Sequence, residues 1–410
     1  MTNTIGSPQG GLVRRQAYLD QLRPWLDSPV VKVLRGVRRC GKSVLLQQLR
    51  SDLVAGGVPE DRVLLINFES GANGGLLGYQ ALYRHVMDWA STGEGRAHVF
   101  LDEVQLVDQW ERAVNSLRVD LDVDLVLTGS NAALLSSELA TLLTGRYVEF
   151  DVYPYSFAEH RSACPSGSVA EGFREYLRVG GMPGIGEVPD ADAAMTYLRD
   201  VSNGILFKDV VARYRLRDVD LLERLVRFVM DNLGQTFSAR RVAEFMKSQR
   251  RSLGAETVYN YLHALMEACL VYKAERYDIR GRRVMETQEK YFLVDHGFAH
   301  SWLGYRPDET PGMLENIVYV ELRRRGYEVH IGKQADLEVD FVAERTGQRL
   351  YVQVAYVLAN ATMVDREFAP LEAIQDNHRK VVLTLDEGPM SSRSGIERHY
   401  LPDFLLDQSW

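Results

Sequence analysis

The 410-residue sequence predicts an α/β fold that begins with a parallel five-stranded sheet and continues into further domains. Three observations predict this fold. A glycine-rich loop lies between an apolar strand and a leucine-rich helix. Short apolar runs then alternate with helical patterns as far as residue 152. Finally, the chain is too long for one ordinary core, so we expect a core at 1–154 followed by segments 155–217, 218–295 and 296–410.

The first strand, residues 30–35, leads into the glycine-rich loop, and a leucine-rich helix runs on to about Leu53. The loop has the spacing G-x-x-x-x-G-K-S, in which backbone N–H groups can surround phosphate oxygens. Lys42 would reach the β- and γ-phosphates, and the Ser43 hydroxyl would hold Mg²⁺. We therefore expect a nucleoside triphosphate to bind here. The residues assigned to this site are Gly36, Val37, Arg38, Arg39, Cys40, Gly41, Lys42, Ser43 and Val44.

Two carboxylates follow the third strand directly. A second buried strand is expected at 62–68, a helix at 79–90 and the third strand at 97–101. Asp102 and Glu103 come next, which is the layout of a Walker B element. Asp102 would support the Mg²⁺, and Glu103 would act as the general base that polarises the attacking water.

The fourth and fifth strands bring further polar candidates. A helix at 108–118 precedes the fourth strand, 124–127, which ends in Thr128, Ser130 and Asn131. These side chains would orient the water or sense the γ-phosphate, although Ser130 or Asn131 could equally cap a helix expected at 132–143. Arg146 precedes the fifth strand, 147–152, and is either a guanidinium that stabilises a transferring phosphoryl group or an ordinary surface arginine.

Several segments together carry a family resemblance. They are GVRRCGKS, FLDEVQ with the following tryptophan, LTGSN, the later GR and DVYPYSFAEH. The sequence resembles the AAA-type ATPases of prokaryotes, and more narrowly the AAA_14 group with a C-terminal DUF4143 domain. The resemblance continues through GGMP at 180–183 and covers nearly the whole chain. It implies strand order 5-1-4-3-2, ATP and Mg²⁺ as cofactors, Arg146 acting on a neighbouring subunit, and a homo-oligomer such as a hexameric ring.

The segment 155–217 has helical patterns expected to form a lid over the nucleotide, and 218–295 has the pattern of a winged helix-turn-helix. Helices are expected at 219–232, 239–247 and 255–269, and β-prone runs at 270–277 and 285–293. Residues 201–290 carry 17 Lys and Arg against 12 Asp and Glu, which favours a polyanion such as DNA. A role in subunit or domain contacts is the alternative. The expected contact residues are Glu256, Thr257, Asn260 and His263 on the third helix, and Arg280, Arg282 and Arg283 at the wing.

The last segment, 296–410, alternates helix and strand. A helix is expected at 314–325 and another at 365–375, with strands at 328–332, 337–342, 350–357 and 380–384. This pattern resembles the PD-(D/E)xK nuclease core, with Glu315, Asp340 and Gln353 at its acidic positions. Ala355 stands where that pattern has lysine, so we expect a degenerate domain used for binding. An ATP-gated DNA nuclease and a nucleotide-switched regulator remain alternatives.

Composition sets the remaining bounds. With no apolar run of about 18 residues and no signal-peptide pattern, we expect a cytoplasmic protein without membrane contact. The three cysteines, Cys40, Cys164 and Cys269, are far apart, which indicates neither a disulfide framework nor a zinc site.

Overall fold

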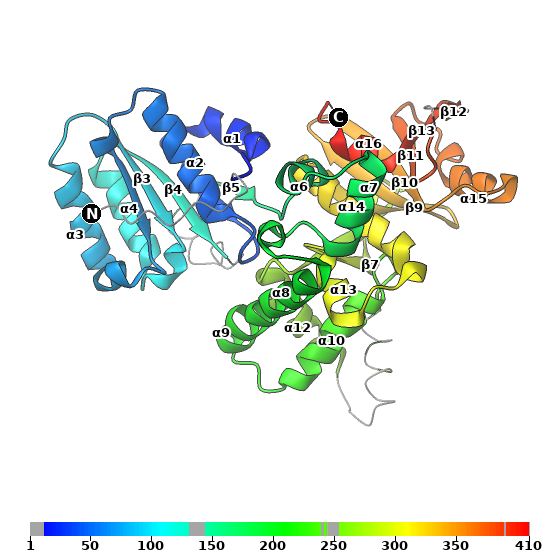
Figure 1. Ribbon diagram of the computed structural model, residues 1–410, viewed down its shortest axis with the longest axis horizontal. Coiled ribbons are helices and arrows are strands. Elements are labelled where there is room, and N and C mark those ends of the chain that lie inside the picture. The colour runs from blue at the N-terminus through cyan, green and yellow to red at the C-terminus, as the bar shows by residue number, and fades with distance from the viewer. Residues whose placement is uncertain are drawn as a thin grey trace. The chain divides into compact units, whose positions relative to one another are not determined.

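The computed structural model describes residues 12–130, 143, 145–238, 242, 244, 254–388 and 391–409. They form two compact units (Figure 1). The N-terminal unit contains Leu12–Val152, and the C-terminal unit contains Tyr153–Met266 together with Leu270 onward. No helix among the described residues is long and apolar enough to cross a membrane.

The N-terminal unit is built on a parallel five-stranded sheet with the order β2-β3-β4-β1-β5, which confirms the expected order. Strands β3 and β4 are buried along their whole length, as expected for a parallel sheet covered on both faces. The strands are β1 (Val31–Arg35), β2 (Val63–Asn67), β3 (Ala97–Asp102), β4 (Val123–Gly129) and β5 (Tyr147–Asp151).

The helices of this unit bury one face each. Helix α3 buries Leu82 and Val86, and α4 buries Ala113 and Leu117, at the three- to four-residue spacing of an amphipathic helix. The α-helices are α1 (Gln16–Leu22), α2 (Lys42–Ala55), α3 (Tyr79–Ala90) and α4 (Trp110–Asp120). The 3₁₀ segments are η1 (Arg23–Trp25), η2 (Glu60–Arg62), η3 (Gly71–Leu76) and η4 (Val104–Leu106). The helix expected at 132–143 falls, except for Leu143, outside the described residues.

Helices open the C-terminal unit, and local capping explains where the first two begin. Ser156 and Ser168 are N-caps, and each forms a reciprocal capping box with the glutamate three residues later. The α-helices are α6 (Phe157–Ala163), α7 (Val169–Val179), α8 (Ala191–Gly204), α9 (Ala212–Tyr214), α10 (Val219–Asp231), α12 (Ala255–Glu267), α13 (Gly297–Leu303), α14 (Thr310–Arg324), α15 (Ala361–Glu372) and α16 (Leu401–Leu406). The π-helix η7 (Ile205–Val211) joins α8 to α9, and 3₁₀ turns occur at η6 (Pro183–Glu187) and η8 (Pro307–Glu309).

A mixed eight-stranded sheet completes the C-terminal unit, with the order β12-β13-β11-β10-β9-β8-β6-β7. The strands are β6 (Val271–Asp278), β7 (Arg283–Leu293), β8 (Glu328–Gln334), β9 (Leu337–Arg345), β10 (Gln348–Ala355), β11 (Arg379–Thr384), β12 (Ser391–Arg393) and β13 (Ile396–Tyr400). The sequence pattern gave no expectation of β12, β13 or α16.

The hairpin expected as a wing is part of this sheet. Strands β6 and β7 pair antiparallel, and β6 also pairs in parallel with β8 through Arg276–Ile331 and Asp278–Lys333. The pairing satisfies backbone groups that an isolated hairpin would leave exposed at its edge. The expected boundary at 295 therefore does not separate two compact bodies. Of the helix expected at 239–247, only positions 242 and 244 are described.

The GGMP segment at 180–183 is a site of close backbone packing. The Asp295 carboxylate accepts hydrogen bonds from Gly181 N (2.7 Å) and Gly297 N (2.8 Å). A Cβ on Gly180 would lie 2.0 Å from Asp295 Oδ1, and one on Gly181 would lie 2.2 Å from the Tyr155 carbonyl oxygen. Only glycine therefore allows this segment to approach Asp295 and the Tyr155 carbonyl so closely.

Candidate active site

The loop between β1 and α2 surrounds a buried lysine. Gly41, with φ +102°, is the N-cap of α2, a backbone conformation that favours glycine. A Cβ on Gly36 would lie 2.1 Å from the Val152 carbonyl oxygen, so the start of the loop also requires glycine. Lys42 is 3% exposed, and its ammonium donates to the carbonyls of Gly36 (2.9 Å) and Val37 (3.2 Å). The loop thus holds a buried positive charge at a helix N-terminus.

This arrangement fits a bound triphosphate. The 14-residue helix α2 has no side-chain cap, so its first N–H groups and its dipole favour an anion at this end. Among the described residues, the Lys42 ammonium is held by the backbone carbonyls of Gly36 and Val37 and by Glu103 Oε1 at 3.7 Å, acceptors that phosphate oxygens can replace. Because residue 36 is glycine, no side chain clashes where the backbone at the start of the loop lies against the Val152 carbonyl.

Asp102 lies at the carboxyl end of β3 and meets the Ser43 hydroxyl. Its carboxylate is 1% exposed and accepts hydrogen bonds from Thr128 Oγ1 (2.6 Å) and Asn67 Nδ2 (3.0 Å). Burial raises the pKa of Asp102, and hydrogen bonds from Thr128 and Ser43 oppose this rise. A serine hydroxyl beside a carboxylate is an oxygen set suited to Mg²⁺. The structure therefore brings the two expected metal ligands together.

Glu103 adopts a left-handed backbone conformation, with φ +56°, which costs a non-glycine residue about 1 kcal/mol. Its N–H donates to Thr128 Oγ1 (2.9 Å), and its carboxylate faces the Lys42 ammonium. Gln105 Nε2 donates to the Glu103 carboxylate and to Ser130 Oγ (3.3 Å). One amide thus links the expected base to the polar turn after β4.

The remaining loop residues have other contacts. Arg38 donates to Glu69 Oε1 (2.6 Å), and Arg39 has a positive φ of +67°. Cys40 is buried, and Val44 follows Ser43 in the first turn of α2. Asn131 lies outside the described residues.

Three residues of the site were missed by the sequence analysis: Arg15, Asn67 and Gln105. Arg15 is 1% exposed and donates from Nη1 to the Cys40 carbonyl (3.0 Å), which braces the loop from the N-terminal segment. Gln105 could have been suspected from its place two residues after Glu103, and Asn67 from its place at the end of β2. No local pattern marks Arg15.

Arg146 does not join this chain's own phosphate site. It is exposed, and its carbonyl accepts a hydrogen bond from Val31 N (2.9 Å) at the start of β1. Strands β1 and β5 are parallel, and the phosphate loop follows the opposite end of β1, about 13 Å further along. Arg146 therefore lies at the edge of the sheet away from the loop that Lys42 occupies.

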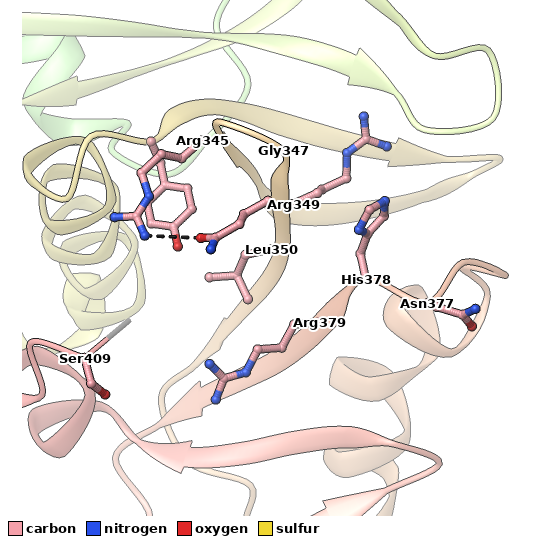
Figure 2. A pocket seen from close by; sticks show the side chains of 10 residues that line it. Arg345, Gly347, Arg349, Leu350, Asn377, His378, Arg379 and Ser409 are labelled. Carbon is pink, nitrogen blue, oxygen red and sulfur yellow. Dashed lines mark hydrogen bonds between the residues drawn. The ribbon is translucent and has the colours of Figure 1, made fainter.

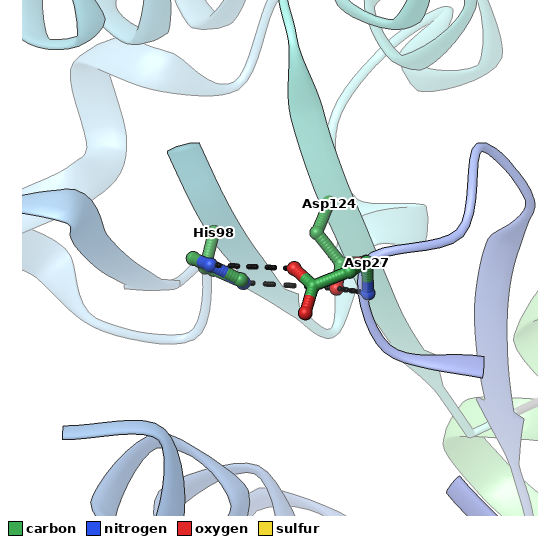
Figure 3. A group of neighbouring side chains, drawn as sticks. All are labelled: Asp27, His98 and Asp124. Atoms are coloured by element: carbon green, nitrogen blue, oxygen red, sulfur yellow. Dashed lines mark hydrogen bonds and ion pairs between the residues drawn. The ribbon is translucent and has the colours of Figure 1, made fainter. Parts of the chain in front are cut away.

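A cluster of ionisable side chains, buried except for Asp27, lies at that same amino-terminal edge (Figure 3). Lys32 and Asp124 form an ion pair with side chains that are 0% and 1% exposed. His98 Nδ1 is 3.6 Å from Asp124, and its Nε2 is 3.8 Å from Asp27. Although Asp27, His98 and Asp124 are close enough to bind a metal, the two carboxylates face different nitrogens of one imidazole and Lys32 already neutralises Asp124. We interpret the cluster as structural.

The positions expected to match a nuclease core lie, in the C-terminal unit, around a lysine from another strand. Asp340 N–H donates to Gln353 Oε1 (3.4 Å), while Lys290 on β7 bonds Glu315 (3.1 Å) and Glu338 (2.8 Å). Burial alone would lower the pKa of Lys290, but Glu315 and the neighbouring carboxylates raise it. Burial raises the pKa of Asp340 well above its ordinary value. Lys290 thus supplies the positive charge at the place where a metal would be needed.

Family models match residues in both units. A family model described as an AAA domain (AAA_14) matches residues 28–160, and a domain of unknown function, DUF8612, matches residues 170–309. The second match corrects the expectation of DUF4143, since the helical segments and the hairpin carry the pattern of a different family.

Two relatives and one solved structure are similar over most of the chain. An uncharacterised protein of Haemophilus influenzae is 37% identical over 399 residues, which is 96% of this chain and 99% of the relative. One of Methanocaldococcus jannaschii is 28% identical over 384 residues, covering 87% and 83% of the two chains. A Walker-type ATPase of Pyrococcus abyssi matches with a TM-score of 0.51 and 17% identity, over 73% of this chain and 98% of that one. This last likeness indicates a shared fold.

Proposed function

The chain belongs to the same family as the Haemophilus influenzae relative and carries an AAA-type P-loop domain, and from this premise we propose that it is a Mg²⁺-dependent ATP hydrolase. The observation that carries the proposal is the meeting of Lys42, Ser43, Asp102 and Glu103 at the carboxyl edge of one sheet. Phosphate binding, metal support and a general base are thereby available at one place.

Each residue has a distinct role in this proposal. Lys42 would exchange the loop carbonyls for the β- and γ-phosphate oxygens, and Ser43 and Asp102 would hold the metal. Mg²⁺, when bound, neutralises charge on the phosphate oxygens. Glu103 orients the water and accepts its proton. Ser130 acts through Gln105 to fix the Glu103 carboxylate, and Asn131 remains a sequence-based candidate for sensing the γ-phosphate.

The direct test is phosphate release from ATP by the full chain. We expect release that requires Mg²⁺, stops with a chelator and is absent in Lys42→Ala. Release that continues unchanged in Lys42→Ala would refute the assignment of the site.

We also propose that the active form is a homo-oligomer in which Arg146 completes a neighbour's site. Its exposure, and its place at the sheet edge away from its own loop, support action between subunits. Arg146→Ala should lower turnover by about 10³-fold, the usual effect of losing such a guanidinium. Mixing Arg146→Ala with Glu103→Gln should restore activity, because intact sites of the first then meet intact arginines of the second. Failure of the mixture to recover activity would leave Arg146 as a surface residue, and Arg112→Ala on α4 is the exposed control.

The third part of the proposal is that the winged-helix region contacts nucleic acid and that ATP turnover drives a rearrangement between the ATPase core and the appended domains. On α12, Glu256, Asn260 and His263 are exposed and Thr257 is half-buried. Arg280, Arg282 and Arg283 are all exposed around the β6–β7 turn. Basic side chains on a turn beside an exposed helix face suit backbone phosphates. Subunit contact is the competing role, and a DNA titration at two salt concentrations separates them.

DNA cleavage is not part of the proposal. Lys290 already pairs with Glu315 and Glu338, so a metal would have to displace a buried ammonium. We therefore expect no Mg²⁺- or Mn²⁺-dependent cleavage.

A further inference from the structure

A basic pocket lies beside the β9–β10 turn of the C-terminal sheet (Figure 2). Its cavity of about 430 Å³ is lined by three arginines and a histidine that come from three parts of the sheet. They are Arg345 at the end of β9, Arg349 near the start of β10, and His378 and Arg379 before and at the start of β11. The lining includes no carboxylate among the described residues. The pocket therefore presents a concentrated positive charge.

Arg345 is fixed in place without an acidic partner among the described residues. Its guanidinium lies 4.7 Å from the centre of the Tyr327 ring and donates to the Arg325 carbonyl (2.9 Å) and to Gln348 Oε1 (3.2 Å). These acceptors are neutral, so they orient the side chain but leave its charge uncompensated. A guanidinium already ordered in this way loses little conformational entropy when it binds an anion.

The other two arginines, Arg349 and Arg379, each pair with a glutamate and also line the cavity. Arg379 forms two hydrogen bonds to Glu397, at 3.1 and 2.8 Å, with 45% of its side chain exposed. Arg349 pairs with Glu344 and donates to the Tyr277 hydroxyl (3.1 Å). Neither Glu344 nor Glu397 lines this cavity. At the described lining of this cavity, an incoming anion would thus meet guanidinium groups and no carboxylate.

The pocket is continuous with the turn of the β6–β7 hairpin. A neighbouring cavity of about 480 Å³ shares Arg345, Arg349 and His378 with it and is also lined by Arg282 of that turn. The hairpin is held beside β8 by strand pairing, and Ile279 N donates to the Lys333 carbonyl (3.0 Å). The turn that carries Arg282 and the strands that form the pocket therefore belong to one sheet. Glu328, Glu344 and Asp376 line the neighbouring cavity, so the more positive part is the pocket itself.

We propose that the pocket of Arg345, Arg349 and Arg379 binds a backbone phosphate of the nucleic acid that the β6–β7 turn contacts. The inference rests on the proposed nucleic-acid role and extends it to a second contact. Guanidinium groups match phosphate oxygens in geometry and charge, and a contact to the backbone positions a duplex without reading its sequence. With Arg282 on the same surface, one strand would pass from the turn to the pocket.

The test is the salt dependence of binding of a labelled DNA duplex to the full chain. Arg379→Gln and Arg345→Gln should each reduce the slope of log K against log salt by about 0.9, the value for one lost phosphate contact. Arg282→Gln should do the same at the turn. Arg306→Gln is the matched control, because Arg306 is also 45% exposed and ion-paired but lies at the start of η8. It should leave the slope unchanged, and thermal unfolding of each variant checks that it is folded.

Other outcomes separate this inference from the function on which it rests. A slope that falls for Arg282→Gln but for neither pocket variant would overturn the pocket contact and leave the nucleic-acid role intact. If the wild-type chain binds no DNA, the nucleic-acid role fails. In that case, thermal unfolding is measured with increasing inorganic phosphate in the Lys42→Ala variant, whose P-loop lacks its lysine, and in the same variant with each pocket or control substitution added. Thermal stabilisation that Arg379→Gln abolishes and Arg306→Gln retains would assign the pocket to a free phosphate instead, and no stabilisation would exclude both sources.

Discussion

Replacing Glu103 by glutamine should separate ATP binding from ATP turnover. The amide keeps the shape of the side chain, and the hydrogen bond from Glu103 N to Thr128 is made by the backbone and is unaffected. The amide oxygen can still accept from Gln105 Nε2. The substitution therefore removes the negative charge and the proton-accepting oxygen and little else.

The geometry fixes the sign of the effect on binding. Glu103 Oε1 lies 3.7 Å from the Lys42 ammonium, with side chains 9% and 3% exposed, and this is the ammonium that must meet the phosphates. A carboxylate there competes with the phosphates and repels them, so glutamine should bind ATP as tightly as glutamate or more tightly. Turnover should fall by about 10²- to 10⁴-fold, the usual contribution of a general base, which corresponds to about 3–5 kcal/mol in the activation barrier.

Two measurements check this expectation. Titration with a fluorescent ATP analogue gives the dissociation constant, and single-turnover phosphate release gives the rate of the chemical step. Glu69→Gln is the control, because that exposed carboxylate pairs with Arg38 beside the same loop and should change the rate by no more than about twofold. A rate within tenfold of wild type would refute Glu103 as the base, and binding weakened by more than tenfold would make its role structural.

Three further expectations follow from buried charges. Lys42→Ala should abolish ATP binding in the same titration while the circular dichroism spectrum stays unchanged. Asp124→Ala should lower the free energy of unfolding in urea by about 3–5 kcal/mol because Lys32 is left buried without its partner, whereas Lys32→Met with Asp124→Leu should recover most of the loss. Burial lowers the pKa of three histidines to about 4, so the folded state binds fewer protons than the unfolded state between pH 6.5 and 4, and stability should fall as the pH falls through that window. The three histidines are His160, His296 and His300. Burial raises the pKa of Asp295 to about 6, so its carboxyl binds a proton in the folded state and partly offsets this loss of stability. His160→Phe should therefore flatten the fall in thermal melting temperature between pH 6.5 and 4.5.

The N-terminal unit could be predicted from the sequence because its signals are local. Most strands are short runs rich in apolar residues, and most polar candidates follow the carboxyl end of a strand. A parallel sheet brings those ends to one edge, so Lys42, Asp102 and Glu103 meet as expected. Arg146 precedes β5, and by the same reasoning it lies at the amino-terminal edge of the sheet, away from the phosphate loop.

The partners that fix these groups could not be predicted. Asn67, Gln105 and Arg15 are single polar residues without a spacing pattern, and their roles depend on contacts formed after the sheet assembles. Arg15 reaches the Cys40 carbonyl across 25 residues of sequence. Lys290 is a similar case, because its pairing with Glu315 requires β7 to lie beside α14, which no motif around either residue indicates.

The pairing of β6 with β8 was equally hidden, because an alternating hairpin pattern does not reveal which strand covers its outer edge. The pairing has a consequence for how ATP turnover can act. A movement of the hairpin away from the C-terminal sheet would break the pairing of Arg276 with Ile331, the hydrogen bond from Ile279 to Lys333 and the ion pair between Arg276 and Glu338. The backbone N–H and C=O groups of the broken strand pairing would then lack hydrogen-bond partners. We therefore expect the β6–β7 turn, the arginine pocket and the Lys290 cluster to move as one body, and any rearrangement driven by ATP to occur outside this sheet.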